Sequence, residues 1–174
     1  MAATLSTDLG ASLAWVFQED RDLSSVIDSS RLEYVASLAN GTGADQADVL
    51  WHDERTVAAT SNDDLDLTNL SSPLFGSTVT FSLVTVKAIL ITNTETAPPA
   101  VLRVGGAGAV AGAFGAPFAG DQDAVVEVPL DSGLLLSNKS SGWAVVNGSS
   151  DLLRIANPGA AAITYRIAIL GTTA

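Results

Sequence analysis

The only histidine of the chain, His52, is the residue best suited to general-base chemistry. A Ser/His/Asp triad needs such a base with a carboxylate behind it. Asp53 and Glu54 follow directly but point away along a predicted strand, and no G-x-S-x-G nucleophile elbow occurs. We therefore expect His52 to be a polar residue on a strand face, and we expect the protein not to be an enzyme.

An acidic run at residues 62–66 (NDDLD) offers oxygen ligands of the kind that calcium prefers. It lacks the alternating spacing, the glycine and the distant glutamate of an EF-hand loop. An acidic turn, in which Asn and Asp side chains bond the local backbone, explains the same residues. We favour the turn and expect no metal, with a calcium ion as the alternative.

A glycine-rich stretch at residues 106–112 (GAGAVAG) is faintly similar to a dinucleotide-binding loop. Its last spacing is one residue too long, no helix pattern follows, and no Gly-Lys-Ser/Thr triplet follows either. We interpret residues 105–120 as an irregular loop and expect no cofactor. Phe114, Pro117 and Phe118 make this loop apolar, so we expect Phe114 and Phe118 to contact a neighbouring subunit.

The three tryptophans, Trp15, Trp51 and Trp143, could act as stacking platforms for sugars. Paired carboxylates for glycoside hydrolysis need not be close in sequence, so the sequence leaves that chemistry open. Tryptophans more often anchor a core or an interface, and we favour that role here. Trp143, at the start of a short apolar strand, is expected to fill the core or an interface.

The elements that must position these residues are nearly all strands. Residues 31–38 alternate, with Leu32, Tyr34, Ala36 and Leu38 on one predicted face. In residues 78–92, the apolar face changes near residue 83, which indicates a bulge or a strand that moves between sheets. The other predicted strands are 13–17, 51–57, 101–104, 124–128, 133–136, 143–146, 152–156 and 163–170.

Turn residues separate these short strands every 8–12 residues, a spacing typical of sandwiches and jelly rolls. We predict an all-β fold, a jelly roll or β-sandwich with an irregular acidic N-terminal segment. Residues 1–174 are expected to form one β domain, in which residues 1–30 form an N-terminal extension or arm. Residues 60–66 are expected to be a polar loop.

The net charge of −11 lies almost entirely in residues 1–70, which hold thirteen acids against three arginines. Such a charge argues against binding to nucleic acid or to anionic lipid, because both require clustered Lys and Arg. The N-terminus lacks the pattern of a signal peptide, and the longest apolar stretch is too short and polar to span a membrane. The mean hydropathy of +0.33 indicates apolar surface that could be hidden between subunits.

The order of several segments resembles a group of small virion proteins of tailed bacteriophages. The resemblance covers most of the chain from about residue 30 onward, and its motifs are structural rather than chemical. They are residues 32–34 (LEY), 40–51 (NGTGADQADVLW), 64–67 (DLDL), 86–93 (VKAILITN), 104–106 (VGG), 151–157 (DLLRIAN) and 165–171 (YRIAILG). The resemblance implies a β-rich virion component, assembled in the host cytoplasm, with no catalytic residues to carry over.

From this resemblance we expect a capsid decoration or cement protein that binds and stabilises the head shell, with the major capsid protein as its partner. By analogy with other cement proteins, a homotrimer is expected. The alternatives are a tail, fibre or receptor-binding component, and a carbohydrate-binding β-sandwich. The acidic segment could dock on a basic shell surface, with Asp63, Asp64 and Asp66 as the docking residues.

Overall fold

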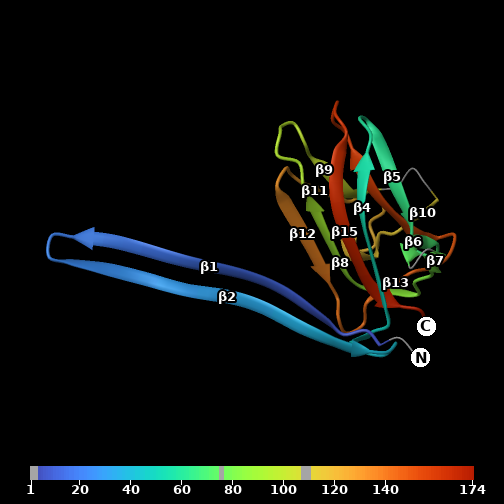
Figure 1. The fold of residues 1–174 in the computed structure, drawn as a ribbon, viewed down its shortest axis with the longest axis horizontal. Helices are drawn as coiled ribbons and strands as arrows, with labels where there is room; N and C mark the ends of the chain where they lie inside the picture. The colour runs from blue at the N-terminus through green and yellow to red at the C-terminus, as the bar shows by residue number, and fades with distance from the viewer. Residues whose placement is uncertain (1–3, 75–76, 107–110) are drawn as a thin grey trace.

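The computed structural model describes residues 4–74, 77–106 and 111–174. It is almost entirely β, as the alternation predicts, and its one described helix is the short 3-10 turn η1, Ala116–Phe118. Two parts are distinct in Figure 1: a long two-stranded hairpin at the N-terminal end, and a body in which the remaining strands gather. We call the hairpin the arm.

The arm consists of β1 (Thr7–Arg21) and β2 (Ser24–Asn40), which pair antiparallel without interruption. Fifteen residue pairs run from Thr7↔Leu38 near the body to Arg21↔Ser24 at the tip. At about 3.3 Å per residue, β1 alone is about 50 Å long. Beyond the body, nothing in the described part of the chain covers the arm (Figure 1).

One sheet of the body, which we call the arm-side sheet, lies next to the root of the arm. Its strand order is β12-β8-β15-β4, with β13 also pairing with β8, and all of these pairs are antiparallel. The bounds are β4 Val49–Val57, β8 Thr85–Asn93, β12 Ser132–Ser137, β13 Trp143–Ala144 and β15 Ile163–Thr172.

The second sheet of the body, which we call the opposite sheet, has the order β10-β14-β9-β11, with β5 pairing with β14. Its strands are β5 Ser61–Asp66, β9 Leu102–Gly105, β10 Gly112–Ala113, β11 Val125–Val128 and β14 Ser150–Asn157. Outside the two sheets, β6 (Leu70–Leu74) and β7 (Ser77–Phe81) form a short ribbon, and β3 (Gln46–Ala47) pairs with the end of β2.

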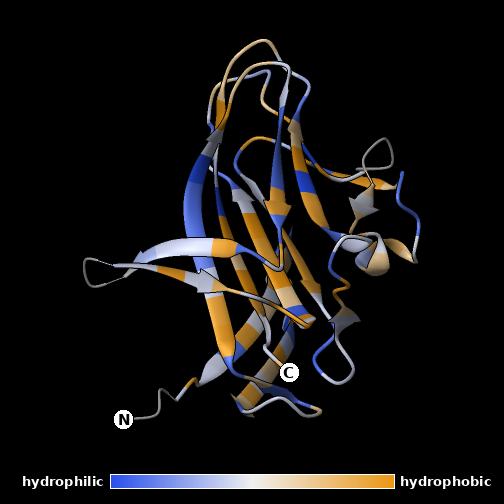
Figure 2. Cartoon of the chain, turned by 90° about the vertical axis from the view of Figure 1, so that its right-hand side faces the viewer, coloured by the Kyte–Doolittle hydropathy of each residue, from blue (hydrophilic) through white to orange (hydrophobic). Residues whose placement is uncertain are grey.

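The core lies between the two sheets. Alternate residues of β15 and β14 are buried, and Ile167 from the arm-side sheet and Ile155 from the opposite sheet belong to one apolar cluster. Hydrophobic segments recur along the strands of the body in Figure 2. The body is therefore a sandwich, held by the burial of one face of each sheet.

Two buried asparagines fix the strand ends. The Asn93 amide at the end of β8 donates to the carbonyls of Ala100 and Val128, each at 3.1 Å. The Asn157 amide at the end of β14 donates to three carbonyls, including that of Ala161 at 2.7 Å. Each side chain thus satisfies carbonyls in loops and at the last residues of neighbouring strands. These two residues end two of the motifs that carry the sequence resemblance.

Several predicted boundaries change. Residues 61–66 form β5 rather than a loop, because the acidic side chains of this segment find partners on neighbouring strands. The predicted strand at 78–92 is two strands, β7 and β8, which belong to different sheets, as its change of face suggested. The acidic N-terminal segment, predicted to be irregular, is a regular hairpin, because β1 and β2 pair over their whole length. The strand predicted at 13–17 is part of β1, and the paired strands extend to Asn40.

Candidate functional site

The arm is amphipathic. Residues directly opposite each other in an antiparallel pair share a face, so the register assigns every arm side chain to one of two faces. The apolar arm face comprises Leu9, Ala11, Leu13, Trp15, Phe17, Val26, Leu32, Tyr34, Ala36 and Leu38. Toward the tip, the same face also carries Glu19, Arg21, Ser24, Asp28 and Ser30. The other face is mostly polar, with Val16, Ile27 and Val35 as its large apolar residues.

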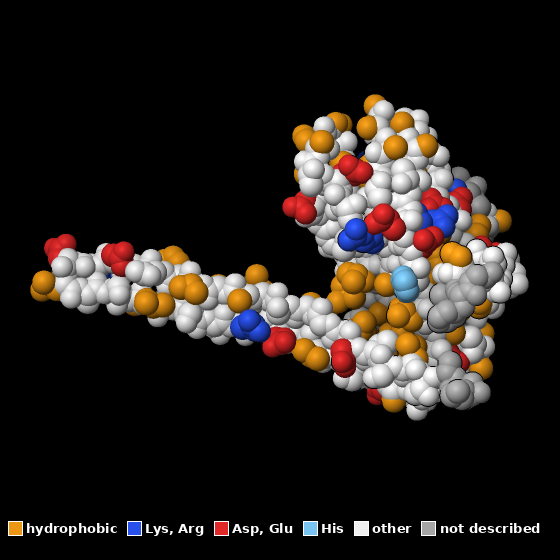
Figure 3. All heavy atoms as spheres, in the orientation of Figure 1, with side chains coloured by type: hydrophobic (Ala, Val, Ile, Leu, Met, Phe, Trp, Pro, Cys, Tyr) orange, Lys and Arg blue, Asp and Glu red, His pale blue; other side chains and the backbone are white. Residues whose placement is uncertain are grey.

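Most of the apolar arm face is open to solvent. Leu13 is 65%, Phe17 is 68% and Leu32 is 69% exposed, and Trp15 is still 41% exposed. Isolated exposed apolar residues are ordinary, but a continuous stripe of this kind marks an interaction surface. Figure 3 shows hydrophobic side chains recurring along the arm and gathering on the body beside its root.

The root of the arm is fixed to the body. Leu38 is 2% exposed and packs with Ala88 and Leu170 of the arm-side sheet, and Leu9 packs against the same cluster. An ion pair of 3.1 Å between Lys139 and Asp45 joins the loop after β2 to the body. The direction in which the arm leaves the body is therefore set by buried contacts rather than by a linker.

The outer face of the arm-side sheet carries its own apolar patch. We call this patch the apolar sheet face, and it comprises Leu50, Ala88, Leu90, Leu135, Ala168 and Leu170. The arm root covers Ala88 and Leu170, which are each 3% exposed, but Leu50 and Leu90 remain 39% and 44% exposed. The edge strands add His52 and Ser137 to the same face, and further along the sheet it becomes polar at Thr92, Arg166 and Glu54.

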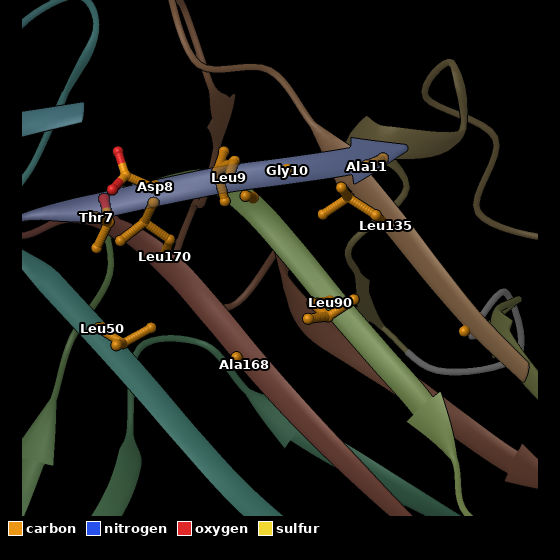
Figure 4. A pocket seen from close by; sticks show the side chains of 12 residues that line it. Thr7, Asp8, Leu9, Gly10, Ala11, Leu50, Leu90, Leu135, Ala168 and Leu170 are labelled. Carbon is orange, nitrogen blue, oxygen red and sulfur yellow. The ribbon is translucent and has the colours of Figure 1, made fainter. Parts of the chain in front are cut away.

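A hollow of about 540 Å³ lies in the corner between the two apolar surfaces. The apolar arm face contributes Leu9 and Ala11, and the apolar sheet face contributes Leu50, Leu90 and Leu135 (Figure 4). Its walls are mostly aliphatic, with Thr7 and Asp8 as the polar members, and include no Lys, Arg or His side chain. Such a hollow suits apolar side chains of a protein segment better than a charged ligand.

The acidic residues expected to dock on a shell have partners within the chain. Asp63 receives two hydrogen bonds from Arg55, at 2.6 and 2.9 Å, and one from the Tyr165 hydroxyl at 2.8 Å. Tyr165 is fully buried, and the Asp63 side chain is 15% exposed. This cluster ties β5 of the opposite sheet to β4 and β15 of the arm-side sheet.

The cluster changes the titration of its members. Burial alone would raise the pKa of Asp63, but the hydrogen bonds from Arg55 and Tyr165 outweigh it and hold that pKa below its ordinary value. The hydrogen bond to Asp63 raises the pKa of Arg55, against the opposing effect of burial. Burial, reinforced by the bond to Asp63, raises the pKa of the Tyr165 hydroxyl. Asp63 is thus a charged structural residue at neutral pH.

Asp64 and Asp66 are also engaged. Asp64 forms a bidentate pair with Arg154, with two contacts of 2.7 Å, and this pair raises the pKa of Arg154. Asp66 accepts hydrogen bonds from the backbone and the hydroxyl of Thr68, the local bonding expected for an acidic turn. Shell docking by Asp63, Asp64 and Asp66 stays a prediction, and these partners would have to be given up or shared.

His52 lies on the exposed face of β4, as predicted, opposite Ala168 of β15. Asp53, the next residue of the strand, lies on the other face and accepts a hydrogen bond from Arg55 at 3.1 Å. Within residues 4–74, 77–106 and 111–174, no group of three or more His, Asp or Glu side chains is placed to hold a metal ion. His52 has no carboxylate partner among its hydrogen bonds in the described part of the chain.

The described end of the apolar loop, residues 111–120, packs on the body through its two phenylalanines. Phe114 is 2% exposed and lies in the core of its own chain, which leaves nothing of its ring for a neighbouring subunit. Phe118 packs against the core while half-buried, so a subunit contact by Phe118 stays a prediction. Residues 107–110 of the glycine-rich stretch lie outside the described residues.

The three tryptophans have three different environments. Trp51 is 2% exposed, and its indole N–H donates to the Ser71 carbonyl at 3.0 Å, so it cannot offer a ring face to a sugar. Trp143 is half-buried against the core. Trp15 lies on the apolar arm face. This face was not predicted as a site from the sequence, although the apolar alternation from Leu9 to Phe17 is a signal that could have identified it.

No known family model matches the chain, and no curated protein matches it either. Among the described residues, no helix is both long and apolar enough to cross a bilayer. The function is therefore inferred from the arm and the apolar sheet face.

Proposed function

We propose that this chain is a non-enzymatic structural protein of an assembled particle, joined to its neighbours through the arm. The observation that carries the proposal is the apolar arm face, exposed along a hairpin about 50 Å long. A two-stranded hairpin by itself is at best marginally stable in water, and it needs a further layer on its apolar face. An arm of this kind is therefore an element that becomes stable on assembly.

The resemblance to small virion proteins of tailed bacteriophages supports a virion as the particle. The specific role that we propose is a capsid decoration protein, with the major capsid protein as a neighbour. In this role the sandwich body supplies a rigid unit, and the arm supplies the adhesive surface. The acidic composition of the chain is consistent with protein partners rather than with nucleic acid or anionic lipid.

Imaging of labelled particles tests this role. The chain has no cysteine, so a Gln122→Cys variant, changed at an exposed position of the body, can carry one gold label. Labels spread over the head shell would support capsid decoration, and labels confined to the tail would support the tail or fibre alternative. Particles that never carry the label, although the variant folds and is present during assembly, would contradict both virion roles.

The salt dependence of particle binding separates the arm from the acidic cluster. Apolar contacts are not weakened by moderate salt, whereas exposed charge pairs are screened. We expect binding to persist as salt rises and to be lost in the double variant Leu13→Ser, Phe17→Ser. The matched control, Val16→Ser with Ile27→Ser, changes equally exposed residues on the other arm face and should still bind. If particle binding falls steeply as salt rises and is unchanged in the Leu13→Ser, Phe17→Ser variant, docking through the acidic residues would be favoured.

A further inference from the structure

We infer that the apolar arm face is covered by a second copy of this chain, and that it lies on the apolar sheet face of that copy. The inference rests on the proposed function, since it names what covers the adhesive element. Its basis is that both surfaces occur on one chain, in one corner, and neither is covered beyond the arm root.

The arm cannot cover the sheet of its own chain. Its root is held by Leu38 and Leu9 against Ala88 and Leu170, and from there an uninterrupted ladder of fifteen pairs carries it away from the body (Figure 1). To fold back, the hairpin would have to break that ladder or its root packing. Only another molecule can therefore cover the exposed part of the apolar sheet face.

The two surfaces match in chemistry. Leu13, Phe17 and Leu32 on the arm are aliphatic or aromatic, and Leu50 and Leu90 on the sheet are aliphatic. Packing one on the other gives two β layers with apolar side chains between them, the arrangement that already holds the sandwich together. The corner hollow, lined by both surfaces, provides space for side chains of the incoming arm.

At the arm root, the apolar arm face already packs on the apolar sheet face. Leu38 from the apolar arm face already packs on Leu170 and Ala88 from the apolar sheet face of the same chain. An incoming arm would extend this contact across the sheet to Leu90 and Leu50, which are the exposed members of the same patch. The proposed interface is thus continuous with an apolar cluster that is already buried.

The length of the arm sets an upper limit on the area of this interface. With strands about 4.8 Å apart, a ribbon about 50 Å long and about 10 Å wide offers a face of about 500 Å². Two arms exchanged between two copies would bury at most about 2,000 Å² in total, because the apolar sheet face is shorter than the arm, and standard interfaces bury about 1,600 Å². A single one-way contact would bury about half as much.

The acidic tip argues against a lipid surface as the occupant. Glu19, Asp20 and Asp22 surround the single Arg21 at the end of the arm, and an anionic membrane would repel them. A second copy needs no charge attraction, since Leu and Phe side chains supply the contact. Exchange between two copies, or around a ring of three, satisfies every arm and every sheet face in a closed assembly.

The test begins with the mass of the wild-type protein in solution, measured by light scattering over about 1–100 μM, a range that covers ordinary micromolar affinities. We expect a dimer or trimer. The arm variant carries Leu13→Ser and Phe17→Ser, the sheet variant carries Leu50→Ser and Leu90→Ser, and the control carries Val16→Ser and Ile27→Ser. We expect the first two to raise the dissociation constant at least about 100-fold, or about 2.7 kcal/mol, and the control to change it less than about threefold.

Mixing the two defective variants gives the sharpest result. The arm variant keeps an intact sheet and the sheet variant keeps an intact arm, so one good interface can form between them. We expect the mixture to form a heterodimer where neither variant alone associates. All six changed side chains are well exposed, between 39% and 73%, so the fold should survive, and circular dichroism would confirm it.

Three outcomes would overturn the inference: a wild-type monomer at the highest concentration, a sheet variant that still associates through its arms, or a mixture that does not complement. A monomer that still joins particles through its arm would overturn this inference and leave the proposed function standing. If the variants complement each other in an oligomer but the protein never joins a particle, the proposed function is overturned and this inference stands.

Discussion

At the scale of single residues, the buried polar groups of the body are structural. Asp63 joins Arg55 and Tyr165 from two other strands, and Asn93 and Asn157 satisfy loop carbonyls. Each is held by neighbours of its own chain. These side chains therefore join strands and loops of the body.

Replacing Asp63 by Asn should lower the free energy of unfolding by about 2 kcal/mol at pH 7, because Arg55 and Tyr165 lose a charged acceptor. The native pKa of Asp63 is lowered, so its stabilising charge is present above the unfolded-state pKa of about 3.9 and is lost as pH falls through the native value. The difference between wild type and variant should therefore be constant from about pH 5 to pH 8 and shrink below about pH 4. Urea unfolding across pH measures it.

The control for this prediction is Glu127→Gln. Glu127 pairs with Arg103 at 3.1 Å, but both side chains are about half exposed. We expect its effect to stay below about 0.5 kcal/mol at every pH. An Asp63→Asn penalty that is equally large at pH 3 would show that shape rather than charge explains the loss.

Trp51 and His52 are neighbours in sequence on opposite faces of β4, which makes them a matched pair. Trp51→Ala should cost about 3–5 kcal/mol, since it empties a buried site and leaves the Ser71 carbonyl without its donor. His52→Ala should cost less than about 0.5 kcal/mol because the side chain is exposed. Trp143→Ala should fall between them, since Trp143 is half-buried. Thermal melts that show the reverse order of stabilities, or an enzymatic activity that is lost when His52 is replaced, would contradict the proposed non-enzymatic role.

At the scale of elements, close contact between β15 and β8 depends on one glycine. The pairing of these strands shifts register between Leu170 and Gly171. A Cβ on Gly171 would overlap the Thr85 carbonyl oxygen and lie 2.9 Å from the Leu83 side chain. Because the oxygen belongs to the backbone of a central strand, it cannot move aside easily.

Gly171→Ala should therefore destabilise the body by about 1–3 kcal/mol, the usual cost of overpacking. The matched control is Gly10→Ala in β1, where the nearest atom is 3.9 Å away and a methyl group fits. That change should be neutral or stabilise the arm by about 0.5 kcal/mol, because glycine weakens a strand interior. Denaturant midpoints of the two variants would decide, and equal midpoints would contradict the role given to Gly171.

At the scale of the whole molecule, the body and the arm differ in what stabilises them. The body buries one face of each sheet within its own chain, whereas the arm beyond its root buries almost nothing. Local stability should follow this difference, since regions with few buried apolar contacts open first. The local stability of the arm should therefore depend on the protein concentration, and that of the body should not.

Hydrogen exchange at about 1 μM and about 100 μM tests this dependence, since binding stabilises only the state that binds. Amides in the outer parts of β1 and β2 should exchange quickly in the dilute sample and become protected in the concentrated one. Amides of β8 and β15 should be protected in both samples. Arm amides protected equally at both concentrations would show that the hairpin is stable without a partner.

The sequence by itself determined many of the body strands and which of their side chains share a face. The strands β14 and β15 were predicted within two residues at each end, because period-2 alternation and the turn residues beside them act locally. The common face of Leu32, Tyr34, Ala36 and Leu38 was predicted for the same reason. The all-β class followed from these local signals.

Only the tertiary structure decided what each face meets. Asp63 and Tyr165 are 102 residues apart in sequence, so no local pattern could pair them or make residues 61–66 a strand. Phe114 was predicted to contact a neighbouring subunit, but it lies in the core of its own chain. The residues of that core come from segments that are distant in sequence. Alternation specifies an apolar face but not its cover, which is why the same pattern is buried in β15 and bare along the arm.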